Sequence, residues 1–330
     1  MSTALHIRQP EVNIVCKNQD VVYDGVYLFT NQRGIAKTAL MMPPAKPATW
    51  ISTYGSLTIS QIGKENPNGG INEAGLVVEQ TTLWQTEYPA PDERSVLSEL
   101  AWIQFLLDTC STVQEALEAT SKIRIDQSTS KLHYLVADRS GDRAIVEFLK
   151  GEMIVHRDNV PVPIIANTAY ADAVQELETG HRDGSHRDEY ERNSMERFLV
   201  VAETLQARLD EGEAPNVDFA FEVLASAQRK DTVFSLVYNI DLMEIYAVTV
   251  RNQERVTIHI ADFDFTKETP AQAVDLQSLH AGHVRDQFET YSAAFNHNAV
   301  MSFFRDPVLT SIFKWEISEE MIHYLAHYPS

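Results

Sequence analysis

The chain has 330 residues, of which 47 are acidic and 27 basic, so its formal net charge is −20. Hydrophobic residues make up 44% of the chain, which is typical of a folded globular protein and excludes a disordered one. A negative charge of this size repels phosphate backbones and anionic lipid surfaces. We therefore expect neither nucleic acid nor a membrane as a partner.

Two cysteines are present, Cys16 and Cys110, and neither belongs to a CxxC pair or to a spacing typical of zinc sites. Two cysteines make no disulfide framework, which fits a reducing compartment. The chain opens without the basic and apolar regions of a signal peptide, and no apolar run reaches the ~18 residues of a membrane span. As written, the protein is expected to be cytoplasmic. A periplasmic protein re-expressed in its mature form behind a new methionine would look the same.

The first half of the chain alternates strand-like and helix-like segments. Residues 2–8 and 11–17 are expected to form two strands around a turn at "RQPE". Further strands are predicted, from their β-branched and aromatic residues, at "GVYLFTN", "TWISTYGSLTISQ" and "GLVVEQTTLW". Residues 95–110 and 111–120 then have apolar side chains at helical spacing, and the second of these opens with a predicted capping box.

The second half repeats this order. Strands are predicted at 131–157 and 232–265, and two helices between them, the first beginning at Asn193 or Ser194. The polar stretch 178–193 is the best candidate for a mobile loop. Blocks of strands separated by helix pairs predict an α+β protein with sheets inside and helices outside. We expect one domain over 1–330, with 267–330 a helical C-terminal extension.

The N-terminus offers a candidate nucleophile. Ser2 becomes the first residue if Met1 is removed, and its free α-amine, with an ordinary pKa of ~7.7–8.0, can then act as the base for its own hydroxyl. Met-Ser-Thr is also a common way for a protein to begin. In "KNQD", Asp20 is suited to orient that amine and Lys17 to hold the carboxylate, although such a sequence also occurs at solvated strand ends.

Six further stretches, taken in order, resemble the choloylglycine hydrolase family of linear-amide C–N hydrolases, which contains penicillin V acylases and conjugated bile-salt hydrolases. They are "NQRGIAKTAL", "YGSLTISQ", "PNGGINEAGLVVE", "LHYLVADRSGDRAIVEFLKGEM", "IIANTAYADA" and "NSMERFLVVAE". The resemblance covers about residues 2–265, and its most specific short piece is G-x-N-E-x-G-L. It implies the four-layer αββα fold of N-terminal-nucleophile hydrolases.

The resemblance also implies a set of catalytic residues. Ser2 falls at the nucleophile position, where the family has cysteine, and Asp20 falls on the family's aspartate. Lys17 stands where many members have arginine. Asn167, in "ANTAY", matches the family's asparagine although the proline that follows in that motif is missing, and Arg197, in "NSMERF", matches its arginine.

The pocket is less well defined by the motifs. Thr82 falls at a position that contributes to the oxyanion hole, and Trp84 is a candidate for lining the acyl pocket. The resemblance implies a small-molecule N-acyl amide as substrate and a homo-oligomer, either dimer or tetramer. No cofactor or metal is expected, since "HAGH" at 280–283 has no convincing third ligand.

The function expected from the sequence is hydrolysis of a linear N-acyl amide bond through Ser2, as in penicillin V acylases and bile-salt hydrolases. The alternative is a catalytically impaired, cysteine-to-serine member, or one that binds acyl amides without hydrolysing them. Ser2 as an engineered replacement of cysteine is a third possibility. Cys16 is the rival nucleophile, but a cysteine at the end of an apolar strand is usually a small buried hydrophobe.

Overall fold

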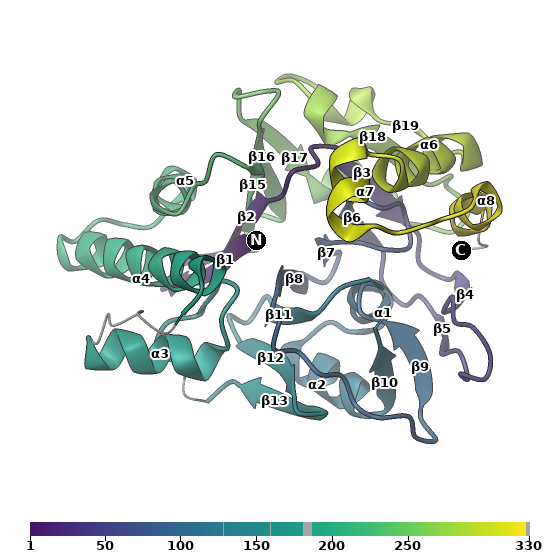
Figure 1. Ribbon diagram of the computed structural model, residues 1–330. Helices are drawn as coiled ribbons and strands as arrows, with labels where there is room; N and C mark the ends of the chain where they lie inside the picture. The colour runs from purple at the N-terminus through teal and green to yellow at the C-terminus, as the bar shows by residue number, and fades with distance from the viewer. Residues whose placement is uncertain (128, 159, 181–186, 328–330) are drawn as a thin grey trace.

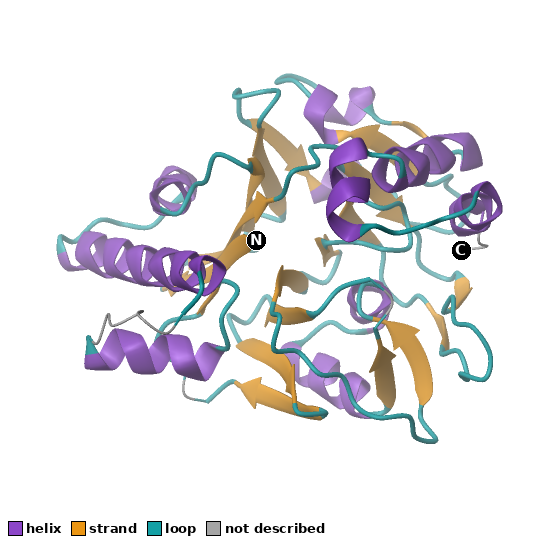
Figure 2. Ribbon diagram, viewed as in Figure 1, coloured by secondary structure: helices purple, strands orange, loops and turns teal. Residues whose placement is uncertain are grey.

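The computed structural model describes residues 1–127, 129–158, 160–180 and 187–327. Within them, two large sheets lie between layers of helices (Figures 1 and 2). The six-stranded sheet has the order β14-β1-β2-β15-β16-β17. Its strands in chain order are β1 (Ser2–Gln9), β2 (Val12–Asp20), β14 (Ile164–Ile165), β15 (Thr232–Asn239), β16 (Glu244–Thr249) and β17 (Val256–His259).

The nine-stranded sheet has the order β13-β12-β11-β8-β7-β6-β3-β18-β19. Its strands are β3 (Tyr27–Asn31), β6 (Ser56–Ser60), β7 (Gly69–Asn72), β8 (Val77–Thr82), β11 (Leu132–Ala137), β12 (Arg143–Leu149), β13 (Glu152–His156), β18 (Gln272–Asp275) and β19 (Glu289–Thr290). Two small sheets join β4 (Ala36–Thr38) to β5 (Thr49–Ile51) and β9 (Ser95–Ser98) to β10 (Ile123–Asp126).

Helices cover the outer faces of both sheets. On the six-stranded sheet lie α3 (Tyr170–Thr179), α4 (Glu189–Asp210) and α5 (Val217–Ser226). Against the nine-stranded sheet lie α1 (Ala101–Thr109), α2 (Val113–Ser121) and α6 (Ala293–Phe304), followed by α7 (Pro307–Phe313) and α8 (Glu319–His327). The result is the expected order of helix, sheet, sheet and helix. No helix in the described part of the chain is long and apolar enough to span a bilayer.

The G-x-N-E-x-G-L stretch forms the turn between β7 and β8. The side-chain oxygen of Asn72 accepts hydrogen bonds from the backbone N–H groups of Ala74 at 3.1 Å and Leu76 at 2.9 Å. A Cβ atom at Gly70 would lie 2.7 Å from the carbonyl oxygen of Leu57 on β6, and Gly75 has a φ of +89°. The two glycines therefore allow a close strand approach and a left-handed turn residue, respectively.

Four elements differ from the sequence-based expectation. Three helices rather than two lie between the two blocks of strands, because Tyr170–Thr179 forms the unexpected helix α3. Ser95–Ser98, predicted as the start of a helix, is strand β9, because it pairs in parallel with β10. Helix α4 begins at Glu189 rather than at Asn193 or Ser194, because Asp188 and Glu191 form a capping box there. The expected loop at 178–193 is therefore helical at both ends, and its residues 181–186 lie outside the described part of the chain.

The segment from 267 onward is not helical throughout. β18 pairs with β3 in the nine-stranded sheet, and β19 pairs with β18. Helices begin only at Ala293. The early part of this segment forms the edge of the nine-stranded sheet, and the part from Ala293 onward packs as a helical layer.

Lys17 and Glu79 join the two sheets through the core. Nζ of Lys17 on β2 lies 2.6 Å from Oε2 of Glu79 on β8, and both side chains are 1% exposed. The hydroxyl of Tyr238 on β15 also donates to Glu79, at 2.5 Å. A buried charge that loses its partner is strongly destabilising.

We expect Lys17→Met to lower the free energy of unfolding by ~3–5 kcal/mol, because it leaves Glu79 buried and unpaired. Adding Glu79→Gln should restore most of this loss, since the glutamine is neutral and keeps an acceptor for Tyr238. Urea unfolding of the single and double variants measures both effects, with the exposed Lys46→Met as the control. A loss below ~1 kcal/mol for Lys17→Met alone would contradict the pairing.

Candidate active site

Ser2 lies at the buried end of β1, the strand between β14 and β2 in the six-stranded sheet. It pairs with Gln19 on β2, and the residue is 3% exposed. Its hydroxyl oxygen lies 2.5 Å from the carbonyl oxygen of Met1 and 3.2 Å from the side-chain oxygen of Gln19. The long pairing of β1 with β2 fixes the position of this hydroxyl.

Asn167 and Arg197 meet at the backbone of Ser2. The backbone N–H of Ser2 donates to Oδ1 of Asn167 at 3.1 Å. The Arg197 guanidinium donates to the same Oδ1, to the Ser2 carbonyl and to Oγ1 of Thr3, each at 2.6 Å. Because Oδ1 accepts from two donors, the amide nitrogen of Asn167 faces the other way, and it donates to the carbonyl of Thr82 at 2.7 Å.

Asp20 ends β2 beside the same cluster. Its Oδ1 accepts from the hydroxyl of Thr232 at 2.6 Å, and the nearest Arg197 nitrogen is 3.8 Å from Oδ2. Burial raises the pKa of Asp20, while the Thr232 hydrogen bond and the Arg197 charge act in the opposite direction. Oδ2 is buried and accepts no hydrogen bond from the described residues. A donor placed beside it would therefore be stabilised.

The other residues singled out from the sequence take different places. Lys17 forms its ion pair with Glu79, between the two sheets, rather than with a group at the N-terminus. Thr82 reaches the cluster through its backbone carbonyl, which accepts from Asn167. Trp84 is 52% exposed, and its ring contacts that of Tyr190 with centroids 5.8 Å apart.

Met1 lies between this cluster and a surface pocket of about 550 Å³. Its α-amine donates to the carbonyl oxygen of Asp20 at 2.7 Å, and burial lowers the pKa of that amine to about 6. The pocket is lined by residues of mixed charge: Met1, Asp188, Glu189, Tyr190, Arg192, Asn193, Glu196 and Arg229. Trp84 lies beside this wall through its contact with Tyr190.

Sequence reasoning missed the wall of this pocket. Tyr190 and Asn193 belong to the first turns of α4, whose polar sequence is typical of a loop. Arg229, which follows α5, donates to Oδ1 of Asn193, and so does Nε of Arg197. The Asp188–Glu191 capping box was the available signal, since it marks a helix start.

Cys16 is not a competitor for the nucleophile position. Its side chain is fully buried within β2, and burial raises the pKa of the thiol. A thiol in this setting stays protonated and out of reach of a substrate. In the part of the chain that the structure describes, no three potential metal ligands converge around Ser2.

A buried polar network supports the segment that carries Asn167. His133 on β11 contacts the carbonyl oxygen of Ala166 through Nε2 at 3.0 Å and Oε1 of Glu147 through Nδ1 at 2.9 Å. Glu147 also accepts from the backbone N–H of Tyr170 at 2.9 Å and contacts Nε2 of His156 at 3.1 Å. The network therefore holds the backbone on both sides of Asn167, at the Ala166 carbonyl and at the Tyr170 N–H.

The order of the layers defines the class of fold. Two stacked sheets between helical layers are the αββα architecture of N-terminal-nucleophile hydrolases. Residues 17–183 match the linear amide C-N hydrolases of the choloylglycine hydrolase family. That match covers half of the chain, so the chain belongs to this family.

Individual relatives agree with this assignment. The chain is 32% identical to the penicillin V acylase of Pectobacterium atrosepticum over 123 residues, which are 32% of this chain and only 33% of that protein. The structure of the penicillin V acylase from Agrobacterium tumefaciens superimposes with a TM-score of 0.74 at 21% identity, covering 88% of this chain and 98% of that one. A mutant conjugated bile acid hydrolase from Clostridium perfringens gives a TM-score of 0.69 at 16% identity, covering 86% of this chain and 100% of that one. At these identities the two structures show a shared fold.

The Glu147 network should make stability depend on pH. Burial opposes ionisation of Glu147, but hydrogen bonds from His133 and His156 outweigh it and lower the pKa to about 2. Because the folded-state pKa is lowered, the stabilisation is fully present above the unfolded pKa of ~4.3 and is lost as the pH falls through about 2.

We expect Glu147→Gln to cost ~3 kcal/mol of unfolding free energy at about pH 5, and this cost should shrink as the pH falls toward 2. Urea unfolding across this pH range measures the trend. Glu152→Gln, at an exposed glutamate of β13, is the matched control and should show no such trend. A cost that stays constant with pH would mean that the ionised carboxylate is not what stabilises the network.

Proposed function

We propose that this protein hydrolyses a linear N-acyl amide bond, with Ser2 as the nucleophile after Met1 has been removed. The observation that carries the proposal is the meeting of Ser2, Asn167 and Arg197 at the end of β1, next to a pocket that Met1 lines. Family membership and the penicillin V acylases among the relatives support an N-acyl amide of that kind as substrate.

Removal of Met1 would turn the backbone nitrogen of Ser2 into a free amine. That nitrogen already lies 3.1 Å from Oδ1 of Asn167, so the amine would begin with one acceptor in place. Burial lowers the pKa of the Met1 amine to about 6, and we expect the same surroundings to lower that of a Ser2 amine. A lowered pKa keeps the amine neutral near pH 7, which a general base requires.

The reaction then follows in two halves. The neutral amine takes the proton of the Ser2 hydroxyl while Oγ attacks the amide carbon, and the second N–H of the Asn167 amide is available for the resulting oxyanion. Such a donor is typically worth ~3 kcal/mol. The C–N bond breaks, and the leaving nitrogen takes the proton from the α-amine. Water, deprotonated by the same amine, attacks the ester and releases the carboxylic acid and the restored hydroxyl.

The remaining residues have supporting roles in this proposal. Asp20, whose Oδ2 accepts no hydrogen bond from the described residues, orients the amine, and Arg197 holds Asn167 and the Ser2 carbonyl. Thr82 fixes the Asn167 amide through its carbonyl. Tyr190 lines the substrate pocket, and Trp84 packs against Tyr190. Lys17 supports the site indirectly, through its ion pair with Glu79 between the two sheets. The substrate classes to test are penicillin V, conjugated bile acids and N-acyl homoserine lactones. A homo-oligomer stays a prediction.

One observation favours the alternative of an impaired or purely binding protein. The nucleophile position holds serine, whereas the resembling family has cysteine there. An alcohol depends wholly on the neighbouring base, while a thiol with an ordinary pKa of ~8.5 is a strong nucleophile in its own right. The two variants below distinguish these possibilities.

The first variant tests the N-terminal amine. A lysine inserted between Met1 and Ser2 should block methionine removal and abolish hydrolysis, whereas the unaltered chain should lack Met1 by intact-mass spectrometry and be active. One residue inserted after the exposed Gly212 is the control and should leave both properties unchanged. In the active protein, kcat/KM should fall on the acidic side at a pH below the ~8 of an ordinary amine. Full activity in a sample that retains Met1 would overturn the mechanism.

The second variant tests the nucleophile itself. We expect Ser2→Cys to raise amide hydrolysis at least about tenfold, because the thiol is the better nucleophile and the longer C–S bond suits a site built for it; a misplacement of ~1 Å can cost ~100-fold. Amine release from the three substrate classes measures this, with Ser2→Ala as the inactive control and every protein confirmed free of Met1. Brisk turnover by the serine form, not improved by cysteine, would identify Ser2 as the established nucleophile. No turnover by either form would favour the binding protein.

A further inference from the structure

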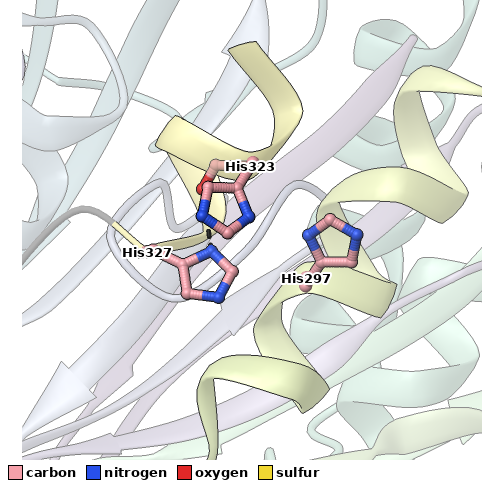
Figure 3. Close-up of side chains that lie close together, drawn as sticks. All are labelled: His297, His323 and His327. Atoms are coloured by element: carbon pink, nitrogen blue, oxygen red, sulfur yellow. Dashed lines mark hydrogen bonds between the residues drawn. The ribbon is translucent and has the colours of Figure 1, made fainter. Parts of the chain in front are cut away.

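Three histidines converge at the C-terminal end of the described chain, far from Ser2 in sequence. His323 and His327 lie one turn apart on α8, so they share a face of that helix. His297, on α6, faces them across the helix pair (Figure 3). One ring nitrogen from each lies within 4.8 Å of the others.

We propose that these three imidazoles form a binding site for a divalent transition metal, with zinc as the ion of choice. Three histidines with an open fourth position are a common ligand set for zinc. Imidazole nitrogens also suit Co²⁺, Ni²⁺ and Cu²⁺, whereas Mg²⁺ and Ca²⁺ require oxygen ligands. The net charge of −20 adds a long-range attraction for any cation.

Two details indicate that the rings are prepared for a ligand. Nδ1 of His327 lies 2.8 Å from the backbone carbonyl oxygen of His323. A carbonyl only accepts, so Nδ1 carries the proton and Nε2 keeps a free lone pair, as in metal-binding histidines with a hydrogen-bonded second nitrogen. Nδ1 of His297 is buried and has no hydrogen-bond partner among the described residues, which is costly unless something coordinates it.

The geometry needs only a small adjustment. Zinc–nitrogen bonds of ~2.0–2.1 Å at tetrahedral angles place the nitrogens ~3.3 Å apart. From a separation of at most 4.8 Å, the rings must approach by at most ~1.5 Å. His323 and His327 are exposed, and rotation toward His297 breaks the stacking of their own two rings, whose centroids lie 3.9 Å apart.

Metal binding would fasten α8 to α6. Of the nine residues of α8, only Ile322 and Ala326 are buried, and the amide of Asn296 on α6 donates to the Ala326 carbonyl at 2.9 Å. A helix this short depends on its tertiary contacts. Met321 and Leu325 of α8 line a largely apolar pocket of about 610 Å³ together with Phe304 of α6. The metal would therefore fix one wall of this second pocket.

Zinc binding to the full chain tests the proposal directly. The protein, without a polyhistidine tag and after dialysis against a chelator, is titrated with ZnCl₂ in a calorimeter. We expect one zinc per chain with a Kd in the micromolar range or below. His297→Ala and His327→Ala should each weaken binding at least tenfold, and His283→Ala, at an exposed histidine outside the cluster, should not.

A second measurement distinguishes coordination by the cluster from scattered surface binding. Co²⁺ should give the intense visible absorption of a four-coordinate site in the unaltered chain and in His283→Ala, but not in His327→Ala. Saturating zinc should raise the melting temperature only where the site is intact. Absence of saturable binding, or equal binding by His327→Ala, would overturn the proposal. None of these readouts depends on hydrolysis, so they stand apart from the test of Ser2.

Discussion

The candidate site depends on one buried guanidinium. Arg197 comes from the middle of α4, yet its side chain reaches the carbonyl of Ser2, the hydroxyl of Thr3 and the amide oxygen of Asn167. These three acceptors belong to the N-terminal strand and to the loop between β14 and α3. A buried guanidinium is costly unless its N–H groups are hydrogen-bonded. The position of Arg197 therefore requires that β1, the loop with Asn167 and α4 pack together. Burial lowers the pKa of Arg197, although an arginine side chain stays protonated in proteins.

Each of the two sheets holds some of the groups that surround Arg197. The six-stranded sheet pins Ser2 through its register with Gln19. The nine-stranded sheet supplies Thr82, whose carbonyl holds the Asn167 amide, and the His133–Glu147 pair, which holds the neighbouring Ala166 carbonyl and Tyr170 N–H. Asn167 is thus fixed by both sheets at once. In the mechanism that we propose, a donor held so firmly would need little reorganisation when charge develops on a substrate oxygen.

The C-terminal segment combines two kinds of structure with different consequences. β18 and β19 extend the nine-stranded sheet beyond β3, so they share in its hydrogen-bonded ladder. Helices α6 to α8 pack outside it, and α8 has a narrow buried face. The histidine cluster and the apolar pocket both include residues of α6 and α8 in this last layer.

The sequence by itself determined the alternation of strand blocks with helices, the G-x-N-E-x-G-L turn and the family, because hydrophobic period, turn residues and short motifs act over a few neighbouring positions. It also pointed to Ser2, Asp20, Asn167 and Arg197, which the tertiary structure brings together, although their catalytic roles stay predictions. Only the tertiary structure decided that Lys17 pairs with Glu79, that Tyr190 and Arg229 line the pocket, and that His297 faces His323 and His327. These contacts depend on strand register and on which layers pack together. Register and layer packing are set by residues far apart in the chain, so a local sequence pattern does not predict them.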